Sequence, residues 1–333
     1  MIDLHLHLDG SLNPKNIPTM AKMAGVELPF DDEAVIRSKM AVGPDCKNLG
    51  EYLMKFDLPL LLLQTAECVE YAVYELIRDL KEQGMRYAEI RFAPQLHLQR
   101  GLTQTEVVKA AVRGRNNGVK DFCLSANLIL CCMRGDKNRA ENARTVRIAE
   151  KFLGCGVCAV DLAGNEAAYP TKDFKDVFAL AKKINVPAVI HAGEAAGADS
   201  IRQALEMGAV RIGHGIHAAE DSVLMRILKE KHIYLEMCYS SNLQTRTVDI
   251  AKDYPLVKFI SDGLFVTLNT DNLTVSDTSL RREYTLVQKQ FSLSDDTLKA
   301  IAENAADAAF LTAREKEDLK KHIDKEFSAW LHR

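Results

Sequence analysis

Polar and apolar residues alternate strictly near the start of the chain, in the run DLHLHLDG at residues 3–10. An alternation with period two predicts a β-strand whose two faces differ. The leucines then point to one side, and His5, His7 and Asp9 point to the other. An apolar face that packs on helices and a polar face that points into a lumen suit a strand of a barrel. Two histidines two residues apart on such a strand can bind one metal ion.

The rest of the chain alternates strand-like and helix-like segments. Seven further strands are expected at 85–93, 124–133, 157–163, 187–192, 210–213, 233–237 and 264–269. Among the helices between them, an apolar stripe runs from Cys68 to Leu80, and a capping box at Thr103–Glu106 opens a helix to about 117. Eight strands that alternate with helices predict an α/β fold, a (β/α)8 TIM-type barrel.

We expect a single catalytic domain over residues 1–333, because nothing resembling a linker, repeat or low-complexity tract divides the chain. Two sets of helices are extra to the barrel. One is a helical lid region at about 14–60, interrupted by a break at Gly43-Pro44, and the other is a group of C-terminal helices at about 279–331.

Composition narrows the functional classes. The net charge of -3 argues against a nucleic-acid surface or a polybasic membrane contact. No apolar run approaches the roughly 18 residues that span a bilayer, and the N-terminus lacks the pattern of a signal peptide. We therefore expect a cytoplasmic protein that acts on a small molecule, with no nucleic-acid or membrane partner. The sequence leaves the oligomeric state open.

The cysteines and one acid–base pair are expected to have structural roles and no catalytic ones. The eight cysteines do not form a disulfide pattern, and the lone C-x-x-C at Cys155 and Cys158 is expected to be buried free thiols. Glu89 and Arg91 share the inner face of the second strand and are expected to form a structural ion pair.

The candidate functional side chains lie at the carboxyl ends of the predicted strands, which is where barrel enzymes carry their catalytic residues. The fifth strand ends at His191 and the eighth leads to Asp271. With His5 and His7 they give three imidazoles and one carboxylate, a donor set that suits one zinc ion with a position left for water. Zinc lowers the pKa of such a water to about 7, which makes a nucleophile available at neutral pH.

Two further residues are candidates for catalysis. Glu194 lies three residues beyond His191, outside the ligand set, and is placed to donate a proton. His214 follows the sixth strand between two glycines and can approach the metal-bound water without binding the metal. Metal, water and acid together predict an enzyme.

The motifs HLHLDGSL, DLAGNE, HAGE, IGHGIH and NTDN, in this order, resemble the adenosine deaminase family, as do EYLMKFDLPL and YAEIRFAP. The resemblance covers nearly the whole chain. It implies a zinc-bearing barrel that hydrolyses adenosine, and 2′-deoxyadenosine as well, to inosine and ammonia in purine salvage. His5, His7, His191 and Asp271 would bind one zinc ion per chain.

The resemblance also implies roles around the purine. Glu194 would protonate ring nitrogen 1, and His214 would orient the attacking water. Gly164 would donate its backbone N–H to ring nitrogen 3, and Asp9 would reach the ribose. Further contacts would come from the ligand His7, from Asn272, and from Leu53 and Phe56 on a helix that gates the pocket.

The chain departs from the family at one position. Many members read NTDD, where the second Asp must be protonated to donate to ring nitrogen 7, whereas this chain reads NTDN. The amide of Asn272 is a donor without protonation. We expect the contact to be kept, with one titrating group fewer.

Alternative functions fit the sequence less well. Adenine deaminases typically carry Glu in place of Asp9, and methylated-AMP deaminases often carry Asn there. Metal-dependent phosphoesterases also open with D-x-H-x-H, but HAGE and NTD are foreign to their pattern. Two-metal amidohydrolases often place a bridging lysine on strand four, where this chain has Asp161. A barrel with a vestigial site, serving only for binding, would have lost a ligand or the acid, and all are present.

Overall fold

Eight parallel strands form the centre of the computed structural model, which describes residues 1–43 and 46–333. They form two four-stranded sheets in sequence order, β1 to β4 and β5 to β8. The strands are β1 (Ile2–His7), β2 (Tyr87–Phe92), β3 (Ser125–Met133), β4 (Val157–Ala163), β5 (Val189–Ala192), β6 (Arg211–His214), β7 (Tyr234–Met237) and β8 (Phe265–Leu268). All eight predicted strands are present, with ends that differ from the prediction by at most three residues.

Backbone hydrogen bonds join the two sheets into a closed barrel. Between β1 and the residues after β8, His7 N donates to Asp271 O (2.8 Å) and Asp271 N donates to His5 O (2.8 Å). Between β4 and β5, Val160 N donates to Pro187 O (2.9 Å). Closure between the first and the last strand places Asp271 beside His5 and His7, although more than 260 positions separate them in the sequence.

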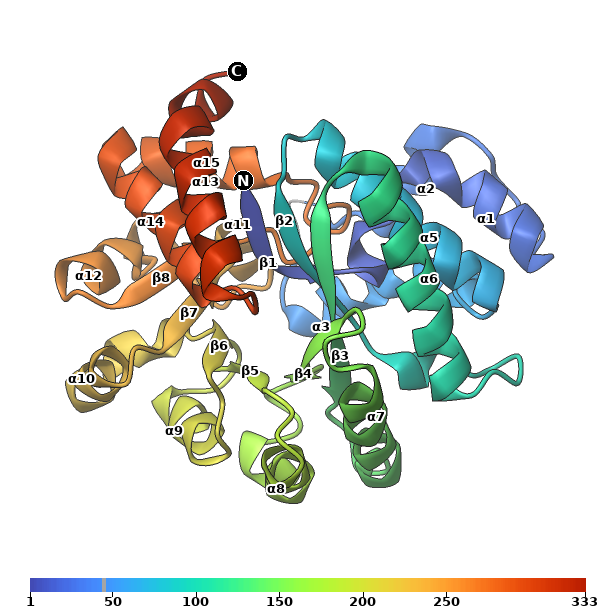
Figure 1. The fold of residues 1–333 in the computed structure, drawn as a ribbon, viewed down its shortest axis with the longest axis horizontal. Coiled ribbons are helices and arrows are strands. Elements are labelled where there is room, and N and C mark those ends of the chain that lie inside the picture. The colour runs from blue at the N-terminus through green and yellow to red at the C-terminus, as the bar shows by residue number, and fades with distance from the viewer. Residues whose placement is uncertain (44–45) are drawn as a thin grey trace.

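Helices cover the outside of the strands and connect them, as Figure 1 shows. The helices that follow the strands are α5 (Ala66–Glu82), α6 (Gln104–Phe122), α7 (Arg139–Phe152), α8 (Lys175–Lys183), α9 (Ala198–Glu206), α10 (Ser222–Glu230), α11 (Tyr239–Gln244) and α12 (Leu256–Ser261). The capping box at Thr103 and Glu106 opens α6 as predicted. The helix runs five residues beyond the predicted end. The short helices α11 and α12 were not predicted.

Additional helices lie at both ends of the chain. Before β2 these are α1 (Ile17–Ala24), α2 (Glu33–Met40), α3 (Leu49–Leu53) and α4 (Asp57–Leu62), and after β8 they are α13 (Leu280–Phe291), α14 (Asp295–Ala308) and α15 (Ala313–Leu331). The break predicted at Gly43-Pro44 lies partly outside the described residues, because Pro44 is not among them. Both sets correspond to the predicted extra helices, and the single-domain TIM-type barrel is confirmed.

The lumen holds charged side chains, and it corrects one prediction. Glu89 and Arg91 are both fully buried on the inner face of β2, but they do not pair with each other. Glu89 pairs with Arg211 of β6, while Arg91 pairs with Asp161 of β4 and Glu236 of β7. Side chains two residues apart on a strand project from the same face in parallel and do not point toward each other. Both point into the lumen, so their partners come from other strands.

All eight cysteines lie among the described residues and carry free thiols. Cys158 is buried as predicted, but Cys155 is exposed, because it lies in the turn before β4 rather than on the strand. Within the described part of the chain, a search finds no helix with the length and hydropathy to cross a membrane.

Candidate active site

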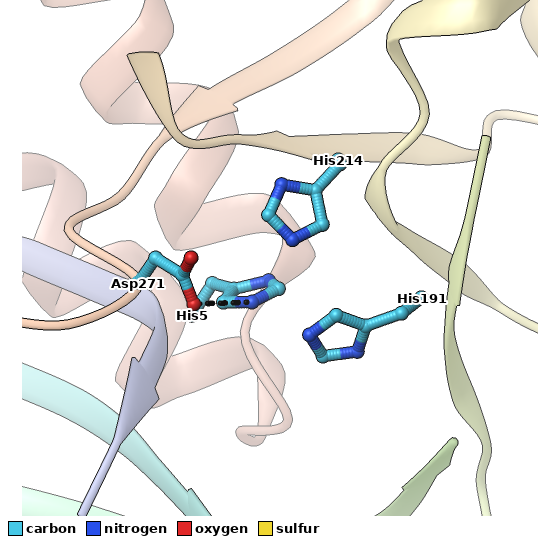
Figure 2. Close-up of side chains that lie close together, drawn as sticks. All are labelled: His5, His191, His214 and Asp271. Carbon is cyan, nitrogen blue, oxygen red and sulfur yellow. Dashed lines mark ion pairs between the residues drawn. The ribbon is translucent and has the colours of Figure 1, made fainter. Parts of the chain in front are cut away.

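Four side chains from separate strand ends converge on one point, as Figure 2 shows. His5 comes from β1, His191 from β5, His214 from β6, and Asp271 from the segment after β8. Each offers one donor atom, and these atoms all lie within 4.8 Å of one another. All four residues are buried. This is the spacing of groups that share a single cation.

His7, a predicted ligand, lies at the same point. Its Nε2 is 3.3 Å from Nε2 of His191 and 3.4 Å from Oδ1 of Asp271. Nε2 of His5 is also 3.4 Å from Oδ1 of Asp271. The structure therefore brings together all four predicted ligands and adds His214 beside them.

Two carboxylates fix the orientation of two of the imidazoles. Nδ1 of His5 lies 2.9 Å from Glu236, and Nδ1 of His191 lies 3.0 Å from Asp161. Since a carboxylate only accepts, the proton of each ring is on Nδ1, and the Nε2 lone pair points to the shared centre. Nε2 of His5 has no hydrogen-bond partner among the described residues. Lone pairs that converge in this way fit a metal ion.

The pKa shifts at the centre agree with a neutral His5 and an anionic Asp271, while at His191 burial is outweighed by the charge of Asp161, which raises the pKa of that imidazole. Burial and the nearby charges of Arg91 and His191 lower the pKa of His5 to about 4. Burial raises the pKa of Asp271, but the close approach of His5 and His7 holds that pKa well below its usual range. Three nitrogens and one carboxylate oxygen are the donor set that zinc takes.

Asp271 is held so that one oxygen faces the centre. Its backbone is left-handed, with φ of 60°. Oδ2 accepts a hydrogen bond from the Ser241 hydroxyl at 2.6 Å, which leaves Oδ1 toward the histidines. Ser241 lies on α11, so this unpredicted helix positions a ligand.

His214 carries its proton on Nε2, whereas His5 and His191 carry theirs on Nδ1. Its Nδ1 lies 3.0 Å from the Asn242 amide nitrogen, whose oxygen accepts from the Tyr254 hydroxyl at 3.2 Å. An amide nitrogen only donates, so Nδ1 of His214 accepts and its Nε2 carries the proton. Nε2–H therefore points into the site as a donor, 3.6 Å from Oε2 of Glu194. This favours the predicted role of His214 beside the water over a role as a ligand.

One arginine connects the carboxylates behind the ligands. The guanidinium of Arg91 donates to Asp161 at 2.9 Å and to Glu236 at 2.8 Å, and it also donates to the carbonyl of Leu4. Its side chain is fully buried. A buried positive charge is stable only when acceptors such as these carboxylates compensate for the lost hydration. Arg91 thus ties the two carboxylates that orient His5 and His191 into one unit.

Glu194 lies beside the converging histidines and Asp271 but is not one of these donors. The residue is 5% exposed, and burial raises the pKa of its carboxyl above the ordinary value, against the opposing charge of His214. A raised pKa favours the protonated form, which is the form that an acid must take to donate.

A cavity of about 270 Å³ opens over these groups. Every residue predicted to contact substrate lines it, namely His7, Asp9, Leu53, Phe56, Gly164 and Asn272. Asp9 is buried, and its Oδ1 has no hydrogen-bond partner within the described residues. Gly164 has φ of 103°, a backbone conformation that favours glycine.

Asn272 makes a contact that the sequence did not predict. Its amide nitrogen donates to the Tyr52 hydroxyl at 2.9 Å, and that hydroxyl lies 2.6 Å from Oγ of Ser276. Tyr52 lies on α3, so the chain of hydrogen bonds connects an N-terminal helix to the end of β8.

Sequence reasoning missed Arg91 as a partner of the site, and it missed Tyr52, Glu166, Ser241 and Asn242. Two signals were available: Glu166 closes the motif DLAGNE, and Ser241-Asn242 begin four residues after the end of the seventh strand.

Comparisons with known proteins point to one family. The family model described as adenosine deaminase matches residues 1–326. Adenosine deaminase of Haemophilus ducreyi is 48% identical over 331 residues, covering 98% of this chain and 96% of the relative. Adenosine deaminase of Enterococcus faecalis is 41% identical, with coverage of 98% and 96%. The crystal structure of adenine deaminase from Arthrobacter aurescens superposes with a TM-score of 0.88 at 25% identity, over 98% of each chain.

The motifs are thus matched by a family model over almost all of the sequence, and the relatives align from end to end. The cluster of histidines with Asp271 and the cavity of about 270 Å³ lie together at one end of the barrel. This chain belongs to the adenosine deaminase family.

Proposed function

We propose that the protein hydrolyses adenosine, and 2′-deoxyadenosine, to inosine and ammonia, with one zinc ion held by His5, His7, His191 and Asp271. The observation that carries the proposal is the convergence of these four donors at a cavity that Glu194 also lines. Bound zinc supplies a water nucleophile at neutral pH. The membership of the chain in the family makes it a hydrolytic deaminase.

The side chains of this chain account for the proton steps. Water adds to carbon 6 of the purine, and negative charge would build on ring nitrogen 1. Glu194, buried and with a raised pKa, donates its proton to that nitrogen and removes the charge. The Nε2–H of His214 donates a hydrogen bond to the attacking oxygen and fixes its position. The hydrogen of the new carbon 6 hydroxyl then passes to the amino group, the carbon–nitrogen bond breaks, and ammonia leaves as the carbonyl of inosine forms. The other proton of the water replaces the one that Glu194 gave.

The substrate contacts support a nucleoside rather than a free base. The buried Asp9 has an acceptor oxygen with no partner among the described residues, and it lines the cavity. A ribose hydroxyl satisfies such an acceptor, whereas adenine alone leaves it unpaired, at the cost of desolvation. The backbone N–H of Gly164 is proposed to donate to ring nitrogen 3.

Residues 14–60 are proposed to act as a lid. Leu53 and Phe56 line the cavity from this region, and Tyr52 connects α3 to Asn272 at the end of β8. An apolar lid excludes water from the purine and strengthens the hydrogen bonds beneath it.

The proposed function is tested by spectrophotometry. The purified metal-loaded protein is incubated with adenosine, 2′-deoxyadenosine and adenine in parallel, and the fall in absorbance near 265 nm is followed. We expect turnover of both nucleosides, with adenine at least about tenfold slower, since one buried hydrogen bond to a charged group is worth about 1.5–3 kcal/mol. Faster turnover of adenine would assign the chain to the adenine deaminases.

Replacement of Asn272 by Ala is expected to weaken adenosine binding about three- to tenfold, since the amide is proposed to donate to ring nitrogen 7. 7-Deazaadenosine lacks that acceptor and serves as the control ligand. The wild-type protein should bind adenosine more tightly than the analogue, and the substitution should abolish this difference. Equal weakening for both ligands would show that Asn272 acts on the lid through Tyr52 and does not contact the purine.

A further inference from the structure

A single buried carboxylate holds the loop that carries Glu194. Glu166, which follows β4, is 2% exposed. Its Oε1 accepts from the backbone N–H of Gly193 at 2.8 Å and from the hydroxyl of Ser200. Its Oε2 accepts from three consecutive backbone N–H groups, those of Glu194 (2.9 Å), Ala195 (2.8 Å) and Ala196 (3.2 Å).

This arrangement requires a carboxylate. Five donors converge on two oxygen atoms, and only an ionised carboxyl group accepts on both. Glutamine at this position would offer one oxygen and would turn its NH₂ group toward N–H groups that also donate. Hydrogen bonds from backbone N–H groups to a charged acceptor are the stronger kind, so Glu166 determines where the loop lies.

Apart from Glu166, the loop is held at the carbonyl of Gly193, which accepts from the backbone N–H of His217 (3.2 Å) and lies 3.0 Å from Nδ1 of the same residue. Gly193 is left-handed, with φ of 69°, and a Cβ there would come within 2.5 Å of the Ile201 side chain. The Glu194 carboxyl itself lies 3.6 Å from Nε2 of His214, beyond hydrogen-bond distance, and receives no hydrogen bond from the described residues. Its position therefore depends on the backbone that Glu166 holds.

We propose that Glu166 is a positioning residue that acts through Glu194: its carboxylate fixes residues 193–196 so that the Glu194 carboxyl meets the purine ring. This rests on the proposed function, in which Glu194 is the proton donor. The negative charge of Glu166 also contributes to raising the pKa of Glu194, after burial and the charge of Asp271.

Glu166→Gln tests the proposal. We expect kcat for adenosine to fall at least about tenfold, KM to change less than about threefold, and metal content to stay that of the wild type. Backbone amides 193–196 should exchange with deuterium faster, while those of β4 keep their rate. Glu315→Gln is the matched control, because Glu315 also accepts from a backbone N–H and a hydroxyl, at the start of α15. It should leave both readouts unchanged.

A double substitution separates positioning from a merely structural role. If Glu166 acts through Glu194, then Glu166→Gln should change kcat less than about twofold in a Glu194→Gln background, since the proton donor is already lost. The proposal is overturned if the two single losses of kcat multiply in the double variant. It is also overturned if backbone amides 193–196 of Glu166→Gln exchange with deuterium at the wild-type rate. Should Glu166→Gln not fold, Ser200→Ala removes one donor from the same carboxylate, and the same two criteria apply to it with smaller effects. Amide exchange does not depend on turnover, so a wild-type protein inactive on adenosine would refute the proposed function separately.

Discussion

Asp271→Asn is expected to remove the metal from the protein and nearly all activity with it. The substitution keeps the size of the side chain, and Asn tolerates the left-handed backbone at this position. It removes the negative charge that faces His5 and His7. Changes behind metal ligands cost about 10- to 100-fold in affinity or activity, so the loss of the charged ligand itself should exceed about 100-fold in both.

Metal content after dialysis, measured by elemental analysis, checks this prediction without reference to turnover. Asp277→Asn is the matched control: Asp277 lies in the same segment, has φ of 47°, and its exposed side chain pairs with Arg37. The control should keep wild-type zinc and activity. If Asp271→Asn protein retained one zinc ion per chain at wild-type affinity, Asp271 would not be a ligand.

The sequence predicted the four donors that converge in the structure because their signals are local. The alternation in residues 3–10 fixes a strand with His5 and His7 on one face, and the barrel rule places His191 and Asp271 at the ends of other strands. The fold followed from the same periodicity, since each of the eight strands has its own apolar pattern.

The partners of the ligands could not be predicted, because they depend on which strands face each other across the lumen. Glu89 and Arg91 look like a pair in the sequence, yet the barrel gives Glu89 to Arg211 and Arg91 to Asp161 and Glu236. The proton on His214 depends on Asn242, which lies on the unpredicted helix α11. A six-residue helix has too little periodicity to be detected.

Glu194→Gln is expected to lower kcat for adenosine about 10²- to 10⁴-fold, the usual contribution of a general acid. Glutamine keeps the shape of the side chain, and its amide can still donate a hydrogen bond to ring nitrogen 1, so KM should change little. It cannot give up a proton, so charge builds on the ring in the transition state. Steady-state kinetics at saturating adenosine measure the effect. Glu220→Gln, at an exposed glutamate near His217, should behave as the wild type.

The pH dependence distinguishes an acid from a residue that only binds. Burial raises the pKa of Glu194, and donation requires the protonated form. The wild-type rate should therefore fall as the pH rises through this pKa, because the carboxyl then loses its proton. Glutamine does not titrate, so the residual activity of Glu194→Gln should lose this dependence. Near-wild-type kcat in the variant would refute the role, and a rise in KM alone would reduce Glu194 to a binding contact.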